Sequence, residues 1–238
     1  MKEWARKRFW AQVSVAAQAG GYNVQLDGRG VRTPAKARLI VPTRALAEGI
    51  AEEWQAQDGT IDPTVMPLTR AANAAIDRVA HAHDEVVAML ADYAGSDLLC
   101  HRAGTPQELR ATQDAAWDPL LHWAATHLNA SLRVTTGIMP VAQPPCATGA
   151  LHDRVAACEA FELTALHDLV VMSGSLIIGL AILEGHDCGE TLWPLSRIDE
   201  EWQARHWGAD ADASAQAENK RRAFLQAERF LHLLRGAA

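Results

Sequence analysis

The first forty or so residues alternate apolar and polar side chains, which is the pattern of half-buried β-strands. Apolar residues occupy every second position of residues 22–26, and the Asp27-Gly28 pair that follows is typical of a hairpin turn. Residues 39–41 form another strand-like run, which Pro42 closes. A further strand is expected from the apolar residues near the N-terminus, which are Phe9, Trp10, Val13 and Val15. The pattern therefore predicts a small, mostly antiparallel β region.

Helical periodicity begins after these strands. Thr43 is a typical N-cap, and Leu46, Ile50 and Trp54 follow it at intervals of four residues, on one face of a helix. A stretch punctuated by prolines, residues 58–67, then interrupts the pattern. We interpret this stretch as the boundary between a β-rich part and the rest of the chain.

From residue 68 onward the apolar positions repeat with helical spacing. The helical stretches that we expect are 69–80, 84–94, 106–128 with a possible break at Asp118-Pro119, 151–183 with an interruption at 173–175, 195–207 and a C-terminal helix. The prediction is an α+β fold, in which a β-rich N-terminal domain of residues 1–62 is followed by a larger α-helical domain of residues 63–238.

The charge and the apolar runs narrow the classes of partner. The chain has 22 Lys and Arg against 29 Asp and Glu, and its net charge of −7 argues against nucleic acid as the main partner. The uncharged run Leu169–Leu183 is shorter than the roughly 20 residues that a membrane-spanning helix needs. We therefore expect a buried helix there and no membrane insertion.

Motifs for catalysis or cofactor binding are missing at the places where they would be sought. The ten histidines and four cysteines form no HExxH or zinc-like spacing. Residues 28–30 lack the third glycine of a dinucleotide motif, and residues 173–175 lack the GxSxG frame of a catalytic serine. His186-Asp187-Cys188 lies between glycines in an expected turn. The sequence predicts no catalytic residues, no metal and no cofactor.

One polar cluster stands out among apolar residues. Asp97 and His101 are four residues apart, so on a helix their side chains would meet, and Arg102 follows directly. Acid–base chemistry by this group would require a pocket. A structural ion pair or a contact with a partner protein is the interpretation that we favour.

The tryptophans suggest a second surface. The chain has eight, and Trp207 follows Glu200, Glu201 and Gln203 closely on the expected helix 195–207. Aromatic and charged residues that are mixed on one short helix are typical of a protein-binding face. A helix that packs domains together and exposes an acidic side would have the same composition, so the residues alone leave both interpretations open.

Several short segments occur in an order that resembles a known family, the assembly chaperones for the alpha subunit of the F-type ATP synthase. Those segments are Arg8-Phe9-Trp10, residues 22–29, Thr33-Pro34, residues 51–54, residues 66–73, Ile76-Asp77, residues 97–102, Gln113, residues 117–119, Trp123, Ser175-Leu176, residues 200–203 and Trp207-Gly208. The family often has Tyr where this chain has His101. Each segment is weak evidence alone, whereas their order over about 200 residues is specific.

The resemblance implies a non-catalytic protein that holds unassembled alpha subunit, without a cofactor, until the beta subunit arrives. It implies a cytoplasmic location in a bacterium and a mitochondrial-matrix location for eukaryotic relatives. Carried over to this sequence, it places the partner-binding surface first at Glu201 and Gln203, beside Glu200, and then at Trp207. Asp97 and Arg102 are second choices. The alternatives are an enzyme that uses a cleft between the two domains and a permanent structural subunit of a complex.

Overall fold

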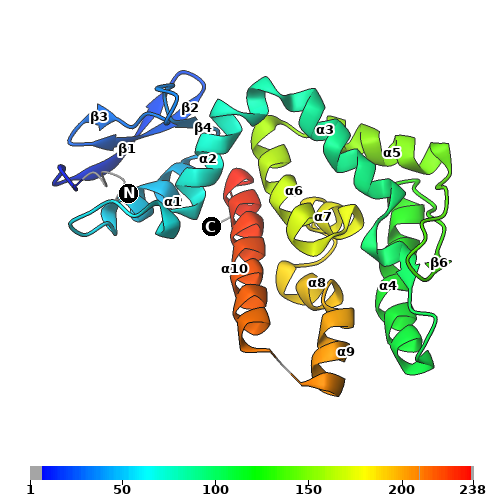
Figure 1. Cartoon of the computed structure of the whole chain (residues 1–238). Coiled ribbons are helices and arrows are strands. Elements are labelled where there is room, and N and C mark those ends of the chain that lie inside the picture. Colours follow the sequence, from blue (N-terminus) through cyan, green and yellow to red (C-terminus); the bar gives the residue numbers. More distant parts are fainter. Residues whose placement is uncertain (1–6, 209, 237–238) are drawn as a thin grey trace. The chain divides into compact units, whose positions relative to one another are not determined.

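The computed structural model describes residues 7–208 and 210–236, which form two compact units (Figure 1). Among these residues, the first unit contains 7–83, 160–165 and 229–236, and the second contains 84–159 and 166–228 apart from residue 209. These units divide the chain differently from the boundary that we expected at residue 62. One helix ends at Gln55, before these prolines, and the next begins at Pro67 and still packs within the first unit.

A four-stranded antiparallel sheet forms one side of the first unit. Strand β2 (Gly21–Leu26) lies at its centre and pairs along its whole length with β1 (Val13–Gln18), with Val13 opposite Leu26. It also pairs with the two short strands β3 (Arg29–Gly30) and β4 (Ile40–Val41). The predicted antiparallel sheet and the turn at Asp27-Gly28 are confirmed, since both turn residues have the positive φ that such a turn requires.

Two helices of the first unit are joined by a buried carboxylate. Helix α1 (Arg44–Gln55) begins at the predicted cap, where the Thr43 hydroxyl accepts a hydrogen bond from the Leu46 amide at 3.2 Å. Glu53 of α1 accepts hydrogen bonds from the amides of Leu68 and Thr69, at 2.7 and 2.8 Å, in the first turn of α2 (Pro67–Asp77). The carboxylate therefore caps the second helix from the first. Short 3-10 turns lie on either side of α2, at Pro63–Val65 and Val79–His81.

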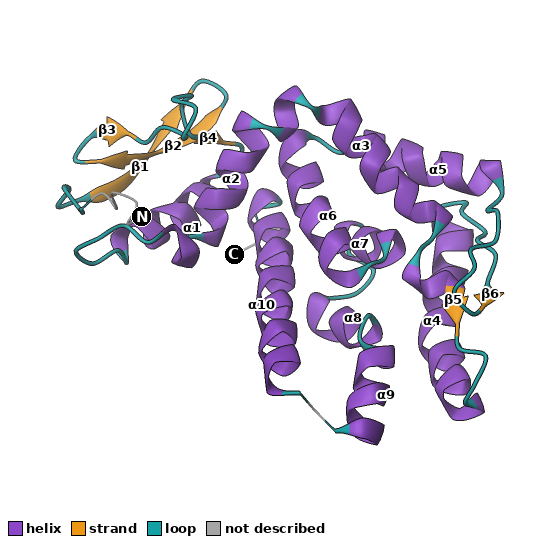
Figure 2. Cartoon of the chain, in the orientation of Figure 1, coloured by secondary structure: helices purple, strands orange, loops and turns teal. Residues whose placement is uncertain are grey.

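The second unit is built mostly of helices, which Figure 2 shows in purple. The α-helices that contribute to it are α3 (His83–Ala91), α4 (Gln107–His127), α5 (Pro145–Ala156), α6 (Ala160–Ser173), α7 (Leu176–Leu183), α8 (Gly189–Leu195), α9 (Ile198–Trp207) and α10 (Ala211–Leu234). The 3-10 turns η3 (Asp92–Gly95) and η4 (Leu98–Cys100) follow α3, and β5 (His101–Arg102) pairs in parallel with β6 (Thr135–Thr136). The α+β class is confirmed.

The long uncharged run forms buried helix. All eight residues of α7 are buried, and Gly174, with a φ of 74°, separates α7 from α6 at the predicted interruption. A Cβ at Gly179 would lie 2.8 Å from the Val170 side chain, so the glycine lets α7 approach α6 closely. Among the described residues, the helices include none that combines the length and the apolar character needed to cross a membrane.

The possible break at Asp118-Pro119 does not occur. Helix α4 continues through Pro119 to His127. Both Pro119 and Ala115, whose carbonyl would normally pair with the missing amide, are exposed. Water can therefore reach that carbonyl, and the helix is not interrupted at Pro119.

Candidate partner-binding site

Helix α9 has the charge distribution that favours a short helix. Asp199, Glu200 and Glu201 lie in its first turn, where carboxylates interact favourably with the amide end of the helix, and Arg205 lies in its last turn. Gly208, with a φ of 94°, follows directly and ends the helix. Local sequence therefore accounts for both ends of α9.

The two faces of α9 differ in burial. Ile198 is buried and Trp202, one turn later, is half-buried, so this face packs inward. Glu200, Gln203 and Trp207 occupy the exposed face at positions i, i+3 and i+7, and Trp207 is 80% exposed. Glu201 is also exposed, beside this face. The structure therefore brings together the four partner-binding residues that were predicted on this helix.

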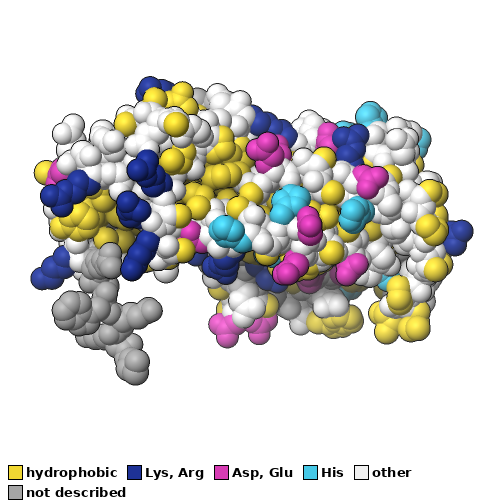
Figure 3. Space-filling view, turned by 90° about the horizontal axis from the view of Figure 1, so that it is seen from above, with side chains coloured by type: hydrophobic (Ala, Val, Ile, Leu, Met, Phe, Trp, Pro, Cys, Tyr) yellow, Lys and Arg dark blue, Asp and Glu magenta, His cyan; other side chains and the backbone are white. Residues whose placement is uncertain are grey.

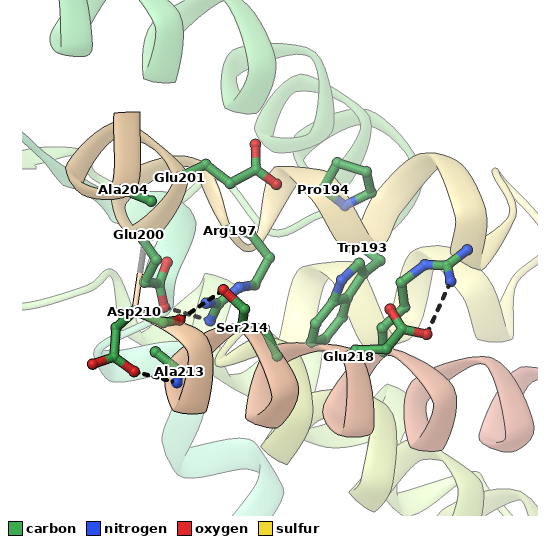
Figure 4. A pocket seen from close by; sticks show the side chains of 12 residues that line it. Trp193, Pro194, Arg197, Glu200, Glu201, Ala204, Asp210, Ala213, Ser214 and Glu218 are labelled. Carbon is green, nitrogen blue, oxygen red and sulfur yellow. Dashed lines mark hydrogen bonds and ion pairs between the residues drawn. The ribbon is translucent and has the colours of Figure 1, made fainter. Parts of the chain in front are cut away.

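A groove of about 430 Å³ lies beside α9 (Figure 4). Helices α8 and α9 form one wall of it, and the first half of α10 forms the other. Its aromatic lining residue is Trp193, and its charged lining residues are Arg197, Glu200, Glu201, Asp210, Glu218 and Arg221. The Trp193 ring packs against Phe224 of α10 at 5.3 Å between ring centroids, which gives the groove an apolar base.

The charges of the groove are only partly paired. Arg197 forms an ion pair with Glu200 at 2.6 Å, and Arg221 forms one with Glu190 at 2.5 Å. The Glu201 carboxylate has no ion pair within the described part of the chain, and its side chain lines the groove (Figure 4). Glu201 is therefore a carboxylate that a cationic side chain of a partner can reach without displacing an existing ion pair.

Side chains of helix α4 form hydrogen bonds that fix the position of α9. The Gln113 side chain donates a hydrogen bond to the Asp199 carboxylate at 2.6 Å, and its own oxygen accepts one from the Ala103 amide at 2.7 Å. The Trp117 indole donates to the Leu195 carbonyl at 2.8 Å, just before α9 begins. Gln113 and Trp117, which both belong to the segments that resemble the family, therefore hold the start of α9 in place.

Arg102 is a buried part of the same support. Its side chain is fully buried, and its guanidinium pairs with Asp114 and Asp118 of α4, each at 2.8 Å, and also donates to the Leu99 carbonyl. The cation lies over the Trp117 ring, 4.9 Å from its centroid. Partial desolvation tends to raise the pKa of Asp114, but the hydrogen bonds from Arg110 and Arg102 outweigh it and lower this pKa below its usual value. Of the two interpretations, Arg102 therefore forms a structural ion pair, but its partners lie on α4 and not within the cluster that the sequence suggested.

Asp97 is also buried, and it does not lie on a helix with His101. Residues 98–100 form a 3-10 turn and His101 begins a strand, so Asp97 and His101 do not share a helix face. The Asp97 carboxylate accepts hydrogen bonds from the Ser175 hydroxyl at 2.8 Å, the Ile177 amide at 3.1 Å and the Leu99 amide at 3.0 Å. Burial raises the pKa of Asp97, although these donors oppose the shift. Asp97 therefore anchors the start of α7.

The sequence did not point to the second wall of the groove. Glu218 and Arg221 lie on α10, and Trp193 lies on α8, outside the segment that composition had singled out. The sequence predicted a C-terminal helix but gave no sign that its first half would face α9. Among the described residues, His, Cys, Asp and Glu side chains form no group of three or more that could hold a metal ion.

Comparison with known protein sequences gives two matches that agree with each other. The sequence model of the family described as ATP12 chaperone protein matches residues 7–125. A Schizosaccharomyces pombe protein named atp12, mitochondrial, is 26% identical over 220 residues, which cover 87% of this chain and 75% of that protein. The match to the family model ends before α9 begins, whereas the match to the yeast protein takes in most of the chain.

Solved structures match over nearly the full length. The crystal structure of Atp12 from Paracoccus denitrificans is 52% identical, with a TM-score of 0.94, and the match covers 98% of this chain and 100% of that one. A crystal structure from Agrobacterium tumefaciens is 38% identical, with a TM-score of 0.88, and that match covers 96% and 85%. Both similarities are strong in sequence as well as in fold.

Proposed function

This chain belongs to the ATP12 chaperone family, and we propose that it holds the unassembled alpha subunit of the ATP synthase F1 sector until the beta subunit pairs with it. The family match is the observation that carries the proposal. A free subunit exposes surfaces that are meant for its neighbours, and such surfaces aggregate. A chaperone that covers one of them reversibly needs no catalytic group. The site of action is the cytoplasm for a bacterial member and the mitochondrial matrix for a eukaryotic one.

We assign the client contact to α9 and the adjoining groove. Trp207 offers a large exposed ring, which is the kind of side chain that dominates protein–protein binding energy. Glu201 and Gln203 lie close to it with exposed polar groups, and Glu200 lines the groove. The acidic character of this surface favours a client segment with Lys or Arg side chains. Asp97 and Arg102 are buried, so we assign them a structural role in supporting this surface and no direct contact with the client.

The direct test of this assignment is capture of refolded alpha subunit by tagged protein. Glu201→Lys reverses the charge of the unpaired carboxylate, and Glu201→Gln removes the charge at nearly constant size. We expect Glu201→Lys to fold normally and to lose capture, and Glu201→Gln to weaken it about tenfold or less. The matched control is Glu85→Lys, which makes the same change at an exposed position of α3.

The outcomes separate the site from the function. Capture by the Glu85→Lys and wild-type proteins, with loss only in Glu201→Lys, supports the assignment. Equal capture by all of these proteins would leave the chaperone role in place and overturn the α9 site. Failure of the wild-type protein to capture alpha subunit would overturn the proposed function itself.

A further inference from the structure

The two units carry opposite charge. The described residues of the first unit include 11 Lys and Arg against 8 Asp and Glu, which gives +3, and those of the second include 9 against 20, which gives −11. Figure 3 shows one face of the molecule, on which dark-blue side chains gather toward the side where Figure 1 draws the strands. The β-rich unit is therefore basic, although the net charge of the whole chain is −7.

Much of this positive charge lies on one hairpin, which we call the basic hairpin (residues 29–38). Arg32 and Arg38 face each other across an antiparallel bridge. The Leu39 amide donates to the Val31 carbonyl at 3.1 Å, and the Thr33 amide donates to the Ala37 carbonyl at 3.0 Å. These hydrogen bonds flank the Arg32–Arg38 pair, which makes it a pair of the closer, non-hydrogen-bonded class.

The cationic side chains of the basic hairpin are exposed, and the Arg32 guanidinium donates one hydrogen bond, to the Lys36 carbonyl at 2.8 Å. Its neighbours Val31 and Leu39 are buried, so the alternation of the strands turns Arg32 and Arg38 outward together. Both are exposed, and so are two further cations of the hairpin, Arg29 and Lys36. Like charges placed directly opposite each other on two strands repel, so the hairpin accommodates an unfavourable arrangement at its surface.

Nearby carboxylates do not neutralise these cations. Across residues 7–208 and 210–236, the four basic side chains have no ion pair with Asp or Glu. The neighbouring Asp27 accepts hydrogen bonds from the amides of Ala11 and Gln12, at 2.8 to 3.2 Å. Asp77 accepts one from the Ala35 amide at 3.0 Å. Both carboxylates therefore already bind backbone donors.

We propose that the basic hairpin is a second docking site, which binds a short acidic segment of a partner protein through Arg29, Arg32, Lys36 and Arg38. Carboxylates of such a segment would relieve the repulsion between the two opposed arginines. A short peptide fits better than a long polyanion. Nucleic acid and an anionic membrane are extended polyanions, which the net charge of −7 on the whole chain repels.

This site goes beyond the client contact proposed for α9. It lies in the first unit, whereas α9 and its groove lie in the second. Its ligand is defined by charge alone, and its test does not use the alpha subunit. The result is therefore independent of the proposed function.

The probe is a fluorescein-labelled ten-residue peptide of alternating Asp and Glu, titrated with the full-length protein at low and physiological salt. We expect binding that weakens steeply with salt and falls at least about tenfold in the Arg32→Glu, Arg38→Glu double variant. The control is Lys220→Glu with Arg222→Glu, which reverses two exposed cations on α10 and should change binding less than about twofold.

A second double variant keeps the test decisive if the charge-reversed variant does not fold. Arg32→Gln with Arg38→Gln removes both charges without adding new repulsion, so it should fold with an equal or higher Tm and still lose peptide binding. Unchanged binding in this variant overturns the site. Tighter binding of the wild-type protein to vesicles with anionic phospholipid, or to a single-stranded oligonucleotide, than to the peptide overturns the assignment of the ligand.

Discussion

The side-chain amide of Gln113 donates a hydrogen bond to the Asp199 carboxylate across 2.6 Å, although 86 residues separate the two in the sequence. Gln113 is buried in the middle of α4, and Asp199 lies in the first turn of α9. The bond ties the exposed, acidic helix to the interior of the second unit. The position of the proposed client-binding surface therefore depends on a residue that no client touches.

Gln113→Ala tests this dependence. The change leaves the Ala103 amide without its acceptor and Asp199 without its donor, and we expect the free energy of unfolding to fall by about 1–3 kcal/mol. Hydrogen exchange should quicken most in peptides from residues 198–207, because the start of α9 loses an anchor. Gln216→Ala, at an exposed position of α10, is the control. Unchanged exchange in 198–207 would show that Gln113 does not position α9.

Trp207→Ala separates binding from folding. The ring is 80% exposed, so its removal should change the free energy of unfolding by less than about 0.5 kcal/mol. If Trp207 is a binding hot spot, the Kd for alpha subunit should rise roughly thirtyfold, which corresponds to about 2 kcal/mol. Phe9→Ala removes another exposed ring, 69% exposed, in the first unit, and should leave this Kd unchanged. Equal losses in both variants would argue against a specific role for Trp207.

Arg102→Lys tests the buried cation. Lysine cannot reach Asp114, Asp118 and the Leu99 carbonyl with the fork that arginine presents, so urea unfolding should report a loss of about 2–4 kcal/mol. Arg110→Lys is the matched comparison, because Arg110 also pairs with Asp114 but is partly exposed. We expect that variant to lose less than about 1 kcal/mol. Similar losses in the two variants would mean that burial of Arg102 adds nothing.

The raised pKa of Asp97 predicts that the stability of the protein depends on pH. Burial raises its pKa above the usual 3.8, so the folded state holds the proton more tightly than the unfolded state does. The stability that this group contributes is therefore complete below pH 3.8 and is lost as the pH rises through the folded-state pKa. Asp97→Asn lacks this titration, so the advantage of the wild-type protein over the variant should be smaller at pH 8 than at pH 4.

Ser175→Ala provides a companion measurement. It removes the hydroxyl that donates to the Asp97 carboxylate, so the pKa of Asp97 should rise further and the pH-dependent loss should extend to higher pH. Thermal unfolding across the pH range measures both effects. An advantage of the wild-type protein over Asp97→Asn that grows with pH would contradict the direction of the shift.

Features set by neighbouring residues were predictable from the sequence. The turn at Asp27-Gly28, the helix cap at Thr43 and the interruption near Gly174 each depend on the chemistry of a few consecutive residues, and each is confirmed. The expected C-terminal helix is present as α10, and its apolar residues Phe224 and Leu231, seven positions apart, are both buried. Periodicity and turn chemistry carry this information directly.

Features set by long-range packing were not predictable. The spacing of Asp97 and His101 would bring their side chains together on a helix, but the Asp97 carboxylate instead binds donors at the start of α7, 78 to 80 residues away. The motif residues Glu53 and Thr69 are explained only once α1 and α2 pack and the carboxylate caps the second helix. Helix α9 was identified by its composition, whereas the groove beside it required α10. Propensity yields to tertiary contacts at such positions.

The measurement that tests the central proposal most directly follows alpha subunit over time. Tagged chaperone is mixed with freshly refolded alpha subunit, and purified beta subunit is added after capture. The account predicts that alpha subunit is retained while it is alone and is released into a complex with beta subunit when beta is added. If alpha subunit is not captured, or if it stays bound to the chaperone after beta subunit is added, the proposal of a transient assembly chaperone is contradicted.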